Sequence, residues 1–292
     1  MKISDFEIHK TEPGDKFYPK ALSRIKKPPK QLFYRGELNR GLLKRSLAVV
    51  GSRRMTHYGK EIIDRFVPTL VSEKITIISG FMYGIDTEAH MKTIENGGAT
   101  IAVLGSGINI CYPSENEKLY VEILEKGGVI MSEYDPDQKA QLWMYSQRNR
   151  IVAGLATLGI LVIEAGEQSG SLITARLASE MDKKVFAVPG PITSSVSSGT
   201  NNLIKSGTAK LVTNPNDILG NLKLQVPSSK QIQNGDKLEI QIISLLGREP
   251  STIDEIAVSL RMDIVELSTK LSLMSLKGLT TESGGKFYLT KI

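Results

Sequence analysis

Short apolar runs alternate with longer stretches of helical spacing between Ser46 and Asn214. The apolar runs read SLAVVGS from 46, ITIISG from 75, TIAVLGSG from 100, GVIMSEY from 128, LGILVIEAG from 158, KVFAVPG from 184 and AKLVTN from 209. Such continuous runs, rich in Val and Ile, are typical of parallel strands buried on both faces. Helical spacing occurs at 58–74, 84–96, 115–126, 148–156 and 171–182, and NNLIKSG adds a short helix. This alternation predicts a doubly wound, Rossmann-like α/β domain with a mostly parallel sheet over residues 46–222.

The chain after this domain has a different pattern. LQVPSSKQIQNGD is polar, contains Pro and Gly and has no periodicity, which predicts a linker at 223–237. Residues 238–292 predict three helices and a hairpin with a Gly-Gly turn, the order of elements in a winged helix. Residues 1–45 are too few for a domain, so we expect them to pack on the main domain.

Composition limits the class of protein. With 292 residues, 40% of them hydrophobic, the chain is long enough for one large domain and a smaller one. No apolar run approaches the roughly 20 residues that span a bilayer, and MKISDFEIHK lacks the apolar stretch of a signal peptide. Cys111 is the only cysteine, which excludes an internal disulfide. We therefore expect a cytoplasmic protein that makes no membrane contact.

The net charge of +6 is concentrated near the N-terminus. Residues 1–45 hold 12 Lys/Arg against 5 Asp/Glu, residues 46–237 hold 19 against 19, and residues 238–292 hold 6 against 7. A basic arm contacts phosphates in some proteins, but solvated surface lysines are the commoner interpretation. The slight acidic excess of the winged helix argues against a major-groove reader and favours protein interaction or dimer packing.

Glycine-containing turns follow several predicted strands, and the carboxyl ends of parallel strands are where such sheets bind ligands. The candidate residues in these turns are Gly51, Ser52, Gly80, Gly105 and Gly107.

The turn Gly51–Arg54 opens the first predicted helix, where backbone N–H groups and the helix dipole favour an anion. It matches neither G-x-G-x-x-G nor a Walker A loop. Two arginines there suit phosphate oxygens, which guanidinium binds in bidentate fashion. The alternative is that one arginine pairs with a carboxylate such as Glu164. Phosphate contact is the favoured interpretation for Arg53, and for Arg54 both remain open.

SQRNRIVAG places Arg148, Asn149 and Arg150 at a predicted helix start. Residues two apart on a helix face different ways, so at most one of the two arginines lines the crevice and the other forms a structural salt bridge. Trp143 and Tyr145 are spaced like a strand or extended loop. Their rings either stack bases, for roughly 1–3 kcal/mol each, or pack in the core.

Ser169-Gly170-Ser171 opens another predicted helix at a strand end, which fits a second anion site, ordinary N-capping, or both. Asp86 and His90 stand four apart, but the structural interpretation, a helix N-terminus and a core histidine, is favoured over a metal site. The sequence indicates no catalytic residues, no metal site and no cofactor.

Together these motifs resemble the DprA, or Smf, family of bacterial DNA-processing proteins of natural transformation. The matching pieces are PKQLFYRGEL, VGSRRMTHYG, SGFMYGIDTEAH, LGSGINICYPSEN, RNRIVAGL, EAGEQSGSLITARLASE and VFAVPGPITSSVSSGTNNLIKSGTAKLV, over roughly residues 17–219. The resemblance implies an extended Rossmann fold and a homodimer. It also implies binding of single-stranded DNA with little sequence preference, protection of incoming DNA, and loading of RecA recombinase.

By motif position, Arg53 corresponds to the family's principal DNA-binding arginine. Ser52, the group at 148–150 and the turn at 169–171 would line the same pocket. Two positions depart from the family. Tyr145-Ser146 replaces the usual Phe-Pro before the RNR group, and Ser114 stands where many relatives have a basic residue, for which Lys118 would substitute.

Two alternatives stay open at this point. One is a nucleotide-binding enzyme similar to the phosphoribohydrolases, which is weakened because GEQSGSLITA lacks their P-G-G-x-G-T-x-x-E signature. The other is an interaction scaffold whose crevice binds nothing.

Overall fold

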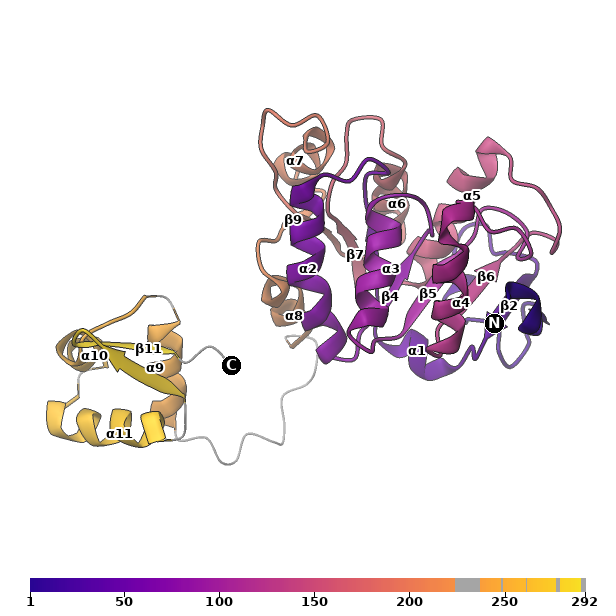
Figure 1. Cartoon of the computed structure of the whole chain (residues 1–292). Coiled ribbons are helices and arrows are strands. Elements are labelled where there is room, and N and C mark those ends of the chain that lie inside the picture. Colours follow the sequence, from indigo (N-terminus) through magenta and orange to yellow (C-terminus); the bar gives the residue numbers. More distant parts are fainter. Residues whose placement is uncertain (224–236, 248, 261, 277–278, 290–292) are drawn as a thin grey trace. The chain divides into compact units, whose positions relative to one another are not determined.

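The computed structural model describes residues 1–223, 237–247, 249–260, 262–276 and 279–289. The chain forms two compact units, Met1–Val226 and Pro227–Ile292 (Figure 1). The predicted linker falls on residues 224–236, which lie outside the described residues.

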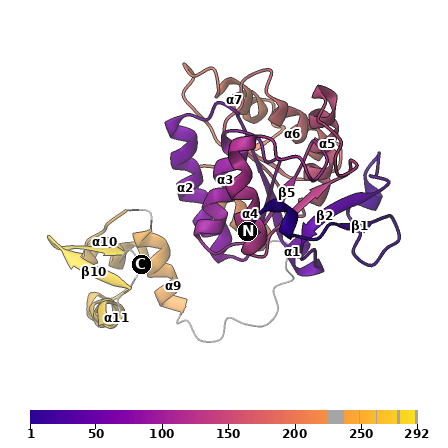
Figure 2. The same cartoon turned by 45° about the vertical axis from the view of Figure 1, so that its right-hand side comes forward.

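The described part of the larger unit contains a nine-stranded sheet in the order β1-β2-β6-β5-β4-β3-β7-β8-β9. The strands are β1 (His9–Thr11), β2 (Leu32–Gly36), β3 (Ser46–Val50), β4 (Thr76–Ser79), β5 (Thr100–Val103), β6 (Val129–Ser132), β7 (Gly159–Val162), β8 (Val185–Ala187) and β9 (Lys210–Leu211). Strands β3 to β9 pair in parallel, as predicted. Strands β1 and β2 form an antiparallel edge beside β6 (Figure 2).

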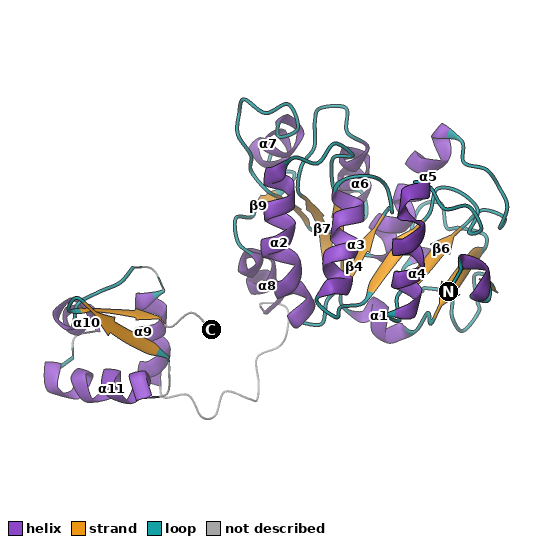
Figure 3. Cartoon of the chain, viewed as in Figure 1, coloured by secondary structure: helices purple, strands orange, loops and turns teal. Residues whose placement is uncertain are grey.

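Helices cover both faces of this sheet (Figure 3). They are α1 (Arg40–Lys44), α2 (His57–Ser72), α3 (Ile85–Glu95), α4 (Glu117–Glu125), α5 (Leu142–Leu155), α6 (Gly170–Ser179), α7 (Ser198–Lys205) and α8 (Pro215–Lys223). Side chains of β3 alternate between the two faces: Leu47 and Val49 pack with α2 and α3, while Ala48 and Val50 pack with α5 and α6. This two-sided burial accounts for the continuous apolar run of the strand.

The basic N-terminal segment belongs to this fold. Besides β1 and β2, it contributes Tyr18, Leu22 and Ile25 to the core cluster that contains α5. The Tyr18 hydroxyl donates a hydrogen bond to the Pro29 carbonyl at 2.8 Å. Close packing of Leu22 leaves no space for a side chain at Gly154 on α5, where a Cβ would lie 2.7 Å from Leu22 Cδ2.

Helix α5 begins six residues earlier than the sequence predicted. Trp143 and Tyr145 therefore lie on a helix, and the expectation of a strand or extended loop was wrong. The helix buries Met144, Arg148, Ile151 and Leu155. Because a charged arginine occupies one position of this buried stripe, the apolar periodicity of its first turns is hidden in the sequence.

The smaller unit contains α9 (Lys237–Leu246), α10 (Ile253–Leu260), α11 (Ile264–Leu276) and the hairpin β10 (Thr280–Ser283) and β11 (Lys286–Leu289). Ser251 forms an isolated antiparallel bridge with Phe287 of β11. The buried core of this smaller unit includes Ile242, Ile256 and Leu267, one from each helix. Three helices and a hairpin confirm the predicted winged helix.

Candidate nucleic-acid interface

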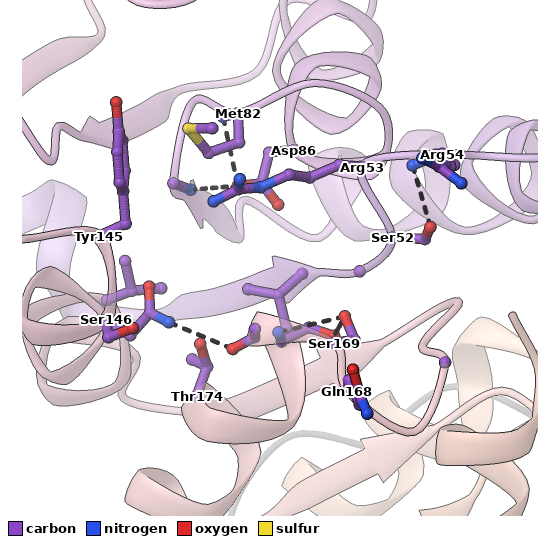
Figure 4. A pocket seen from close by; sticks show the side chains of 18 of the residues that line it. Ser52, Arg53, Arg54, Met82, Asp86, Tyr145, Ser146, Gln168, Ser169 and Thr174 are labelled. Atoms are coloured by element: carbon purple, nitrogen blue, oxygen red, sulfur yellow. Dashed lines mark hydrogen bonds between the residues drawn. The ribbon is translucent and has the colours of Figure 1, made fainter. Parts of the chain in front are cut away.

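A cavity of about 840 Å³ opens at the carboxyl end of β3. From β3 the sheet grows in one direction through β4, β5 and β6 and in the other through β7 and β8, so the cavity occupies the topological switch point where such sheets bind ligands. Its lining, shown in part in Figure 4, consists of Val50, Gly51, Ser52, Arg53, Arg54, Gly80, Met82, Asp86, Tyr145, Ser146, Arg148, Asn149, Val152, Gly166, Gln168, Ser169, Gly170, Ser171, Thr174, Ser195 and Val196.

The turn after β3 is held against the start of α3. The backbone N–H of Ile85 donates to the Ser52 carbonyl at 3.1 Å, and the N–H of Arg54 donates to Ser52 Oγ at 3.0 Å. Gly84 precedes α3 with φ +75°, and a Cβ there would lie 2.3 Å from the Ser52 carbonyl oxygen. The path of the turn therefore depends on a glycine in the neighbouring loop.

Arg53 and Arg54 are both exposed, and neither forms an ion pair with a described residue. Glu164, the alternative partner considered for them, instead accepts hydrogen bonds from the N–H and hydroxyl of Thr56, the N-cap of α2. The Arg53 guanidinium lies over the Tyr145 ring, with 5.5 Å between Cζ and the ring centroid. Figure 4 shows the Arg53 side chain extending into the cavity toward Tyr145.

Arg148 of α5 lies buried under the cavity and connects α5 with the carboxyl ends of β4 and β5. Its Nη1 donates to the carbonyls of Gly80 and Val103, at the carboxyl ends of β4 and β5. Burial lowers the pKa of Arg148 to about 10, and the Asp86 charge opposes this shift. Burial raises the pKa of Asp86, while the Arg148 charge, hydrogen bonds from Ser79 and the Met82 backbone, and the Arg53 charge oppose that shift. Arg148 therefore positions the strand ends from below.

Arg150 points away from this cavity and lines no part of it. Its two terminal nitrogens donate to the two carboxylate oxygens of Glu133, each at 2.6 Å, and its Nε donates to the Lys27 carbonyl at 2.8 Å. The two arginines thus divide as their spacing predicted, one at the cavity and one in a salt bridge, but the expectation that the whole group at 148–150 lines the cavity was wrong for Arg150.

The opposite side of the cavity is formed by the start of α6. Ser169 is its N-cap, and Ser169 Oγ lies 2.7 Å from Ser171 Oγ. Asn149 of α5 donates through Nδ2 to the Gly170 carbonyl at 3.2 Å, which connects the two helices. Ser169 is therefore both a cap and part of the lining, and the first-turn N–H groups of α6 lie at the cavity edge.

Two predicted glycines support the site without lining it. A Cβ at Gly105 would lie 2.6 Å from Tyr145 Cδ1, so the absent side chain provides the space for that ring. At Gly107 a Cβ would lie 2.2 Å and 2.3 Å from the carbonyl oxygens of Asp135 and Pro136.

Sequence reasoning did not assign several lining residues to the site: Met82, Asp86, Ser146, Gln168, Thr174, Ser195 and Val196. Asp86 was noted only as a helix-start residue, whereas in the structure its Oδ2 accepts a hydrogen bond from the Gly80 N–H at 3.1 Å. Ser195 and Val196 come from the loop after β8, whose only signal was a run of small polar residues.

The charged groups of the lining are three arginines and one carboxylate, Asp86. Among the described residues, no group of three or more His, Cys, Asp or Glu side chains is placed to hold a metal ion. The chemistry offered to a ligand is therefore that of an anion-binding crevice.

None of the helices that the structure describes has the length and apolar character needed to cross a membrane.

An open α/β sheet with an arginine- and glycine-lined cavity at its switch point is the arrangement in which proteins of this class bind phosphate groups of nucleotides or nucleic acids. The chain belongs to the DNA recombination-mediator protein A family, whose model matches residues 10–223. The model of the DprA winged helix domain matches residues 226–286. These matches confirm the resemblance seen in the sequence.

Two relatives match most of the chain. Protein Smf of Escherichia coli is 37% identical over 281 residues, which is 92% of this chain and 74% of that protein. DNA processing protein DprA of Streptococcus pneumoniae is 43% identical over 206 residues, 70% of this chain and 71% of that protein.

Two solved structures share the fold. DprA of Streptococcus pneumoniae superposes with a TM-score of 0.68 at 41% identity, covering 73% of this chain and 74% of that one. DprA of Helicobacter pylori, described for its unique single-stranded DNA binding mode, gives a TM-score of 0.67 at 30% identity and covers 76% of this chain and 99% of that one.

Proposed function

We propose that this chain binds single-stranded DNA in the switch-point cavity and acts as a recombination mediator. The observation that carries the proposal is Arg53, an exposed guanidinium that forms no ion pair among the described residues and lies over an aromatic ring at the edge of the cavity. Guanidinium binds phosphate in bidentate fashion, and an adjacent ring stacks an unpaired base.

The same geometry favours a single strand over a duplex. The cavity volume falls within the range of small-ligand pockets, about 300–1,000 Å³. A flexible strand with unstacked bases fits into such a space, whereas a rigid duplex does not. Contacts to phosphates and to ring faces carry little sequence information, so binding is expected to tolerate any base order.

The wider role follows from family membership and is part of the proposal. A mediator that covers incoming single strands in the cytoplasm would protect them and load RecA recombinase onto them during natural transformation. A homodimer would bring two cavities to one strand and raise the effective concentration of each. Because the arrangement needs no chemical step, the proposed protein is not an enzyme.

The proposal is tested by fluorescence anisotropy with labelled oligo-dT and the Arg53→Ala protein. Losing a charged hydrogen-bond donor to phosphate is expected to weaken binding by roughly ten- to a hundredfold. The dependence of log K on log salt should also fall by about one. Arg65→Ala is the matched control, because Arg65 is an exposed arginine of α2 outside the cavity. Equal affinities of the two variants would contradict a phosphate clamp at Arg53.

A further inference from the structure

Two exposed tyrosines continue the aromatic surface that begins at Tyr145. The Tyr112 ring centroid lies 5.9 Å from that of Tyr145, and the Tyr83 centroid lies 6.2 Å from that of Tyr112. Tyr83 is 40% exposed and Tyr112 is 44% exposed, although neither lines the cavity. We refer to Tyr83, Tyr112 and Tyr145 as the aromatic patch.

The patch is held by structured loops. Tyr83 directly precedes Gly84 at the start of α3, and its hydroxyl donates to Glu115 Oε2 at 3.0 Å. Tyr112 lies between β5 and α4, next to the buried Pro113. Both loops follow the carboxyl ends of strands, so the patch adjoins the cavity on the β4 and β5 side.

Charge defines the two ends of the patch. At the cavity end, the Arg53 guanidinium lies over Tyr145. At the other end, hydrogen bonds from its own backbone N–H, from the Tyr83 hydroxyl and from Ser114 lower the pKa of Glu115, which therefore carries a negative charge at neutral pH. The attraction for phosphate is therefore confined to the cavity end, and the contact that the rings at the other end offer to a strand is stacking of its bases.

We propose that the bases of the strand segment leaving the cavity stack on Tyr112 and then on Tyr83. The inference rests on the proposed function and deepens it, because it assigns two further base subsites and an exit over β4 and β5. The face of an aromatic ring stacks on any base. Each stacked base contributes enough binding free energy for the loss of one ring to be measured. Contact between the rings alone, edge-to-face for Tyr83 and Tyr112 and tilted for Tyr112 and Tyr145, would account for the ring spacings but leaves the exposed ring surfaces without a role.

The test compares Tyr83→Leu and Tyr112→Leu with Tyr83→Phe and Tyr112→Phe. Leucine keeps an apolar side chain and removes the ring, while phenylalanine keeps the ring and removes the hydroxyl. For oligo-dT of about twenty nucleotides, each leucine variant is expected to lose about tenfold in affinity, and the phenylalanine variants to bind like the unaltered protein. A fragment of about four nucleotides, measured by competition, should bind every variant equally, because it occupies only the cavity.

Phe17→Leu is the matched control, because Phe17 is a 50% exposed ring that lines a separate cavity with Leu155 and Thr157. A 2-aminopurine placed in the long oligonucleotide should lose fluorescence on binding the native protein and lose less on binding the leucine variants. Equal affinities of the leucine and phenylalanine variants for the long strand would overturn the two subsites. If Arg53→Ala still weakens binding in that case, the proposed function stands; if it does not, both fail.

Discussion

Arg148 and Arg150 show how the surroundings of a side chain decide its role. Both are arginines of one helix and both are buried, but Arg148 donates to strand-end carbonyls under the cavity while Arg150 pairs with Glu133. Their spacing on the helix predicted that the two side chains would point in different directions. It did not predict which one would face the crevice, because that depends on where α5 begins.

The Arg150–Glu133 pair gives a prediction about stability. Arg150→Met should lower the free energy of unfolding by about 3–5 kcal/mol, because it leaves the Glu133 carboxylate buried without its partner. Urea titration measures this loss. The double variant Arg150→Met/Glu133→Gln should recover part of the loss. If the folded Arg150→Met protein instead keeps full stability and loses DNA affinity, Arg150 belongs to the binding site.

His90 gives a prediction about pH. Burial lowers the pKa of His90 to about 3, so the folded protein holds the ring neutral while the unfolded chain takes up a proton below the ordinary value of 6.5. The contribution of this group to stability is therefore present above pH 6.5 and is lost as the pH falls from 6.5 toward 3. At pH 5 the loss should reach about 2 kcal/mol.

His90→Gln isolates this effect. Glutamine has no titrating group, and Thr100 Oγ1, which lies 2.7 Å from His90 Nδ1, keeps its own hydrogen bond to the Ile77 carbonyl. The stability difference between the native protein and His90→Gln should therefore shift in favour of the variant between pH 7 and pH 5, as measured by urea unfolding. A difference that stays constant with pH would contradict a neutral buried ring.

At the scale of elements, the contact between the turn after β3 and the start of α3 organises the site. Gly84→Ala places a Cβ 2.3 Å from the Ser52 carbonyl oxygen at a φ of +75°, so we expect a stability loss of about 3 kcal/mol. Gly97→Ala is the control, since φ is +70° there and no atom lies within 4 Å of the added Cβ.

The control substitution should cost about 1 kcal/mol, from backbone strain alone. Thermal unfolding gives both values. Because Gly84 also fixes the carbonyls of Ser52 and Arg53, the folded Gly84→Ala protein should bind oligo-dT more weakly than Gly97→Ala. Equal stability and equal affinity of the two variants would show that this contact does not position the turn.

The elements that the sequence predicted well are those whose burial is apolar and two-sided. The central strands of the parallel sheet belong to this group, while the three helices of the winged helix were predicted from apolar residues at helical spacing on one face. Strands β1 and β2 were missed because β1 has only three residues and both strands lie at an antiparallel edge, within a segment that is rich in Lys and Pro. The start of α5 was missed because Arg148 interrupts its apolar stripe.

The candidate site was predictable where it consists of turns at strand ends. Gly51–Arg54, Gly80 and Ser169–Ser171 are separated in sequence, and all three line one cavity, because parallel strands present their carboxyl ends at the same edge. Gly105 and Gly107 look identical to the lining glycines in sequence. Their neighbours, a tyrosine ring and two carbonyls, become visible only in three dimensions.

At the scale of the whole molecule, the distribution of charges favours the larger unit as the DNA-binding unit. The basic N-terminal segment is folded into that unit as β1, β2 and core residues, and the cavity lining has an excess of arginine. The winged helix holds slightly more acids than bases. Its helix α11 exposes Val265 at 74% and Leu273 at 47%, which favours protein contact for this unit over DNA reading.

Photo-crosslinking tests the central claim most directly, because it locates the bound strand on the intact chain. Oligo-dT carrying 4-thiothymidine is bound to the full protein and irradiated, and the crosslinked peptides are identified by mass spectrometry. We expect crosslinks within peptides that contain residues 51–54, 145 or 166–174, and their loss in Arg53→Ala. Crosslinks confined to the winged helix, or unchanged in Arg53→Ala, would contradict the assignment of the cavity as the single-strand site.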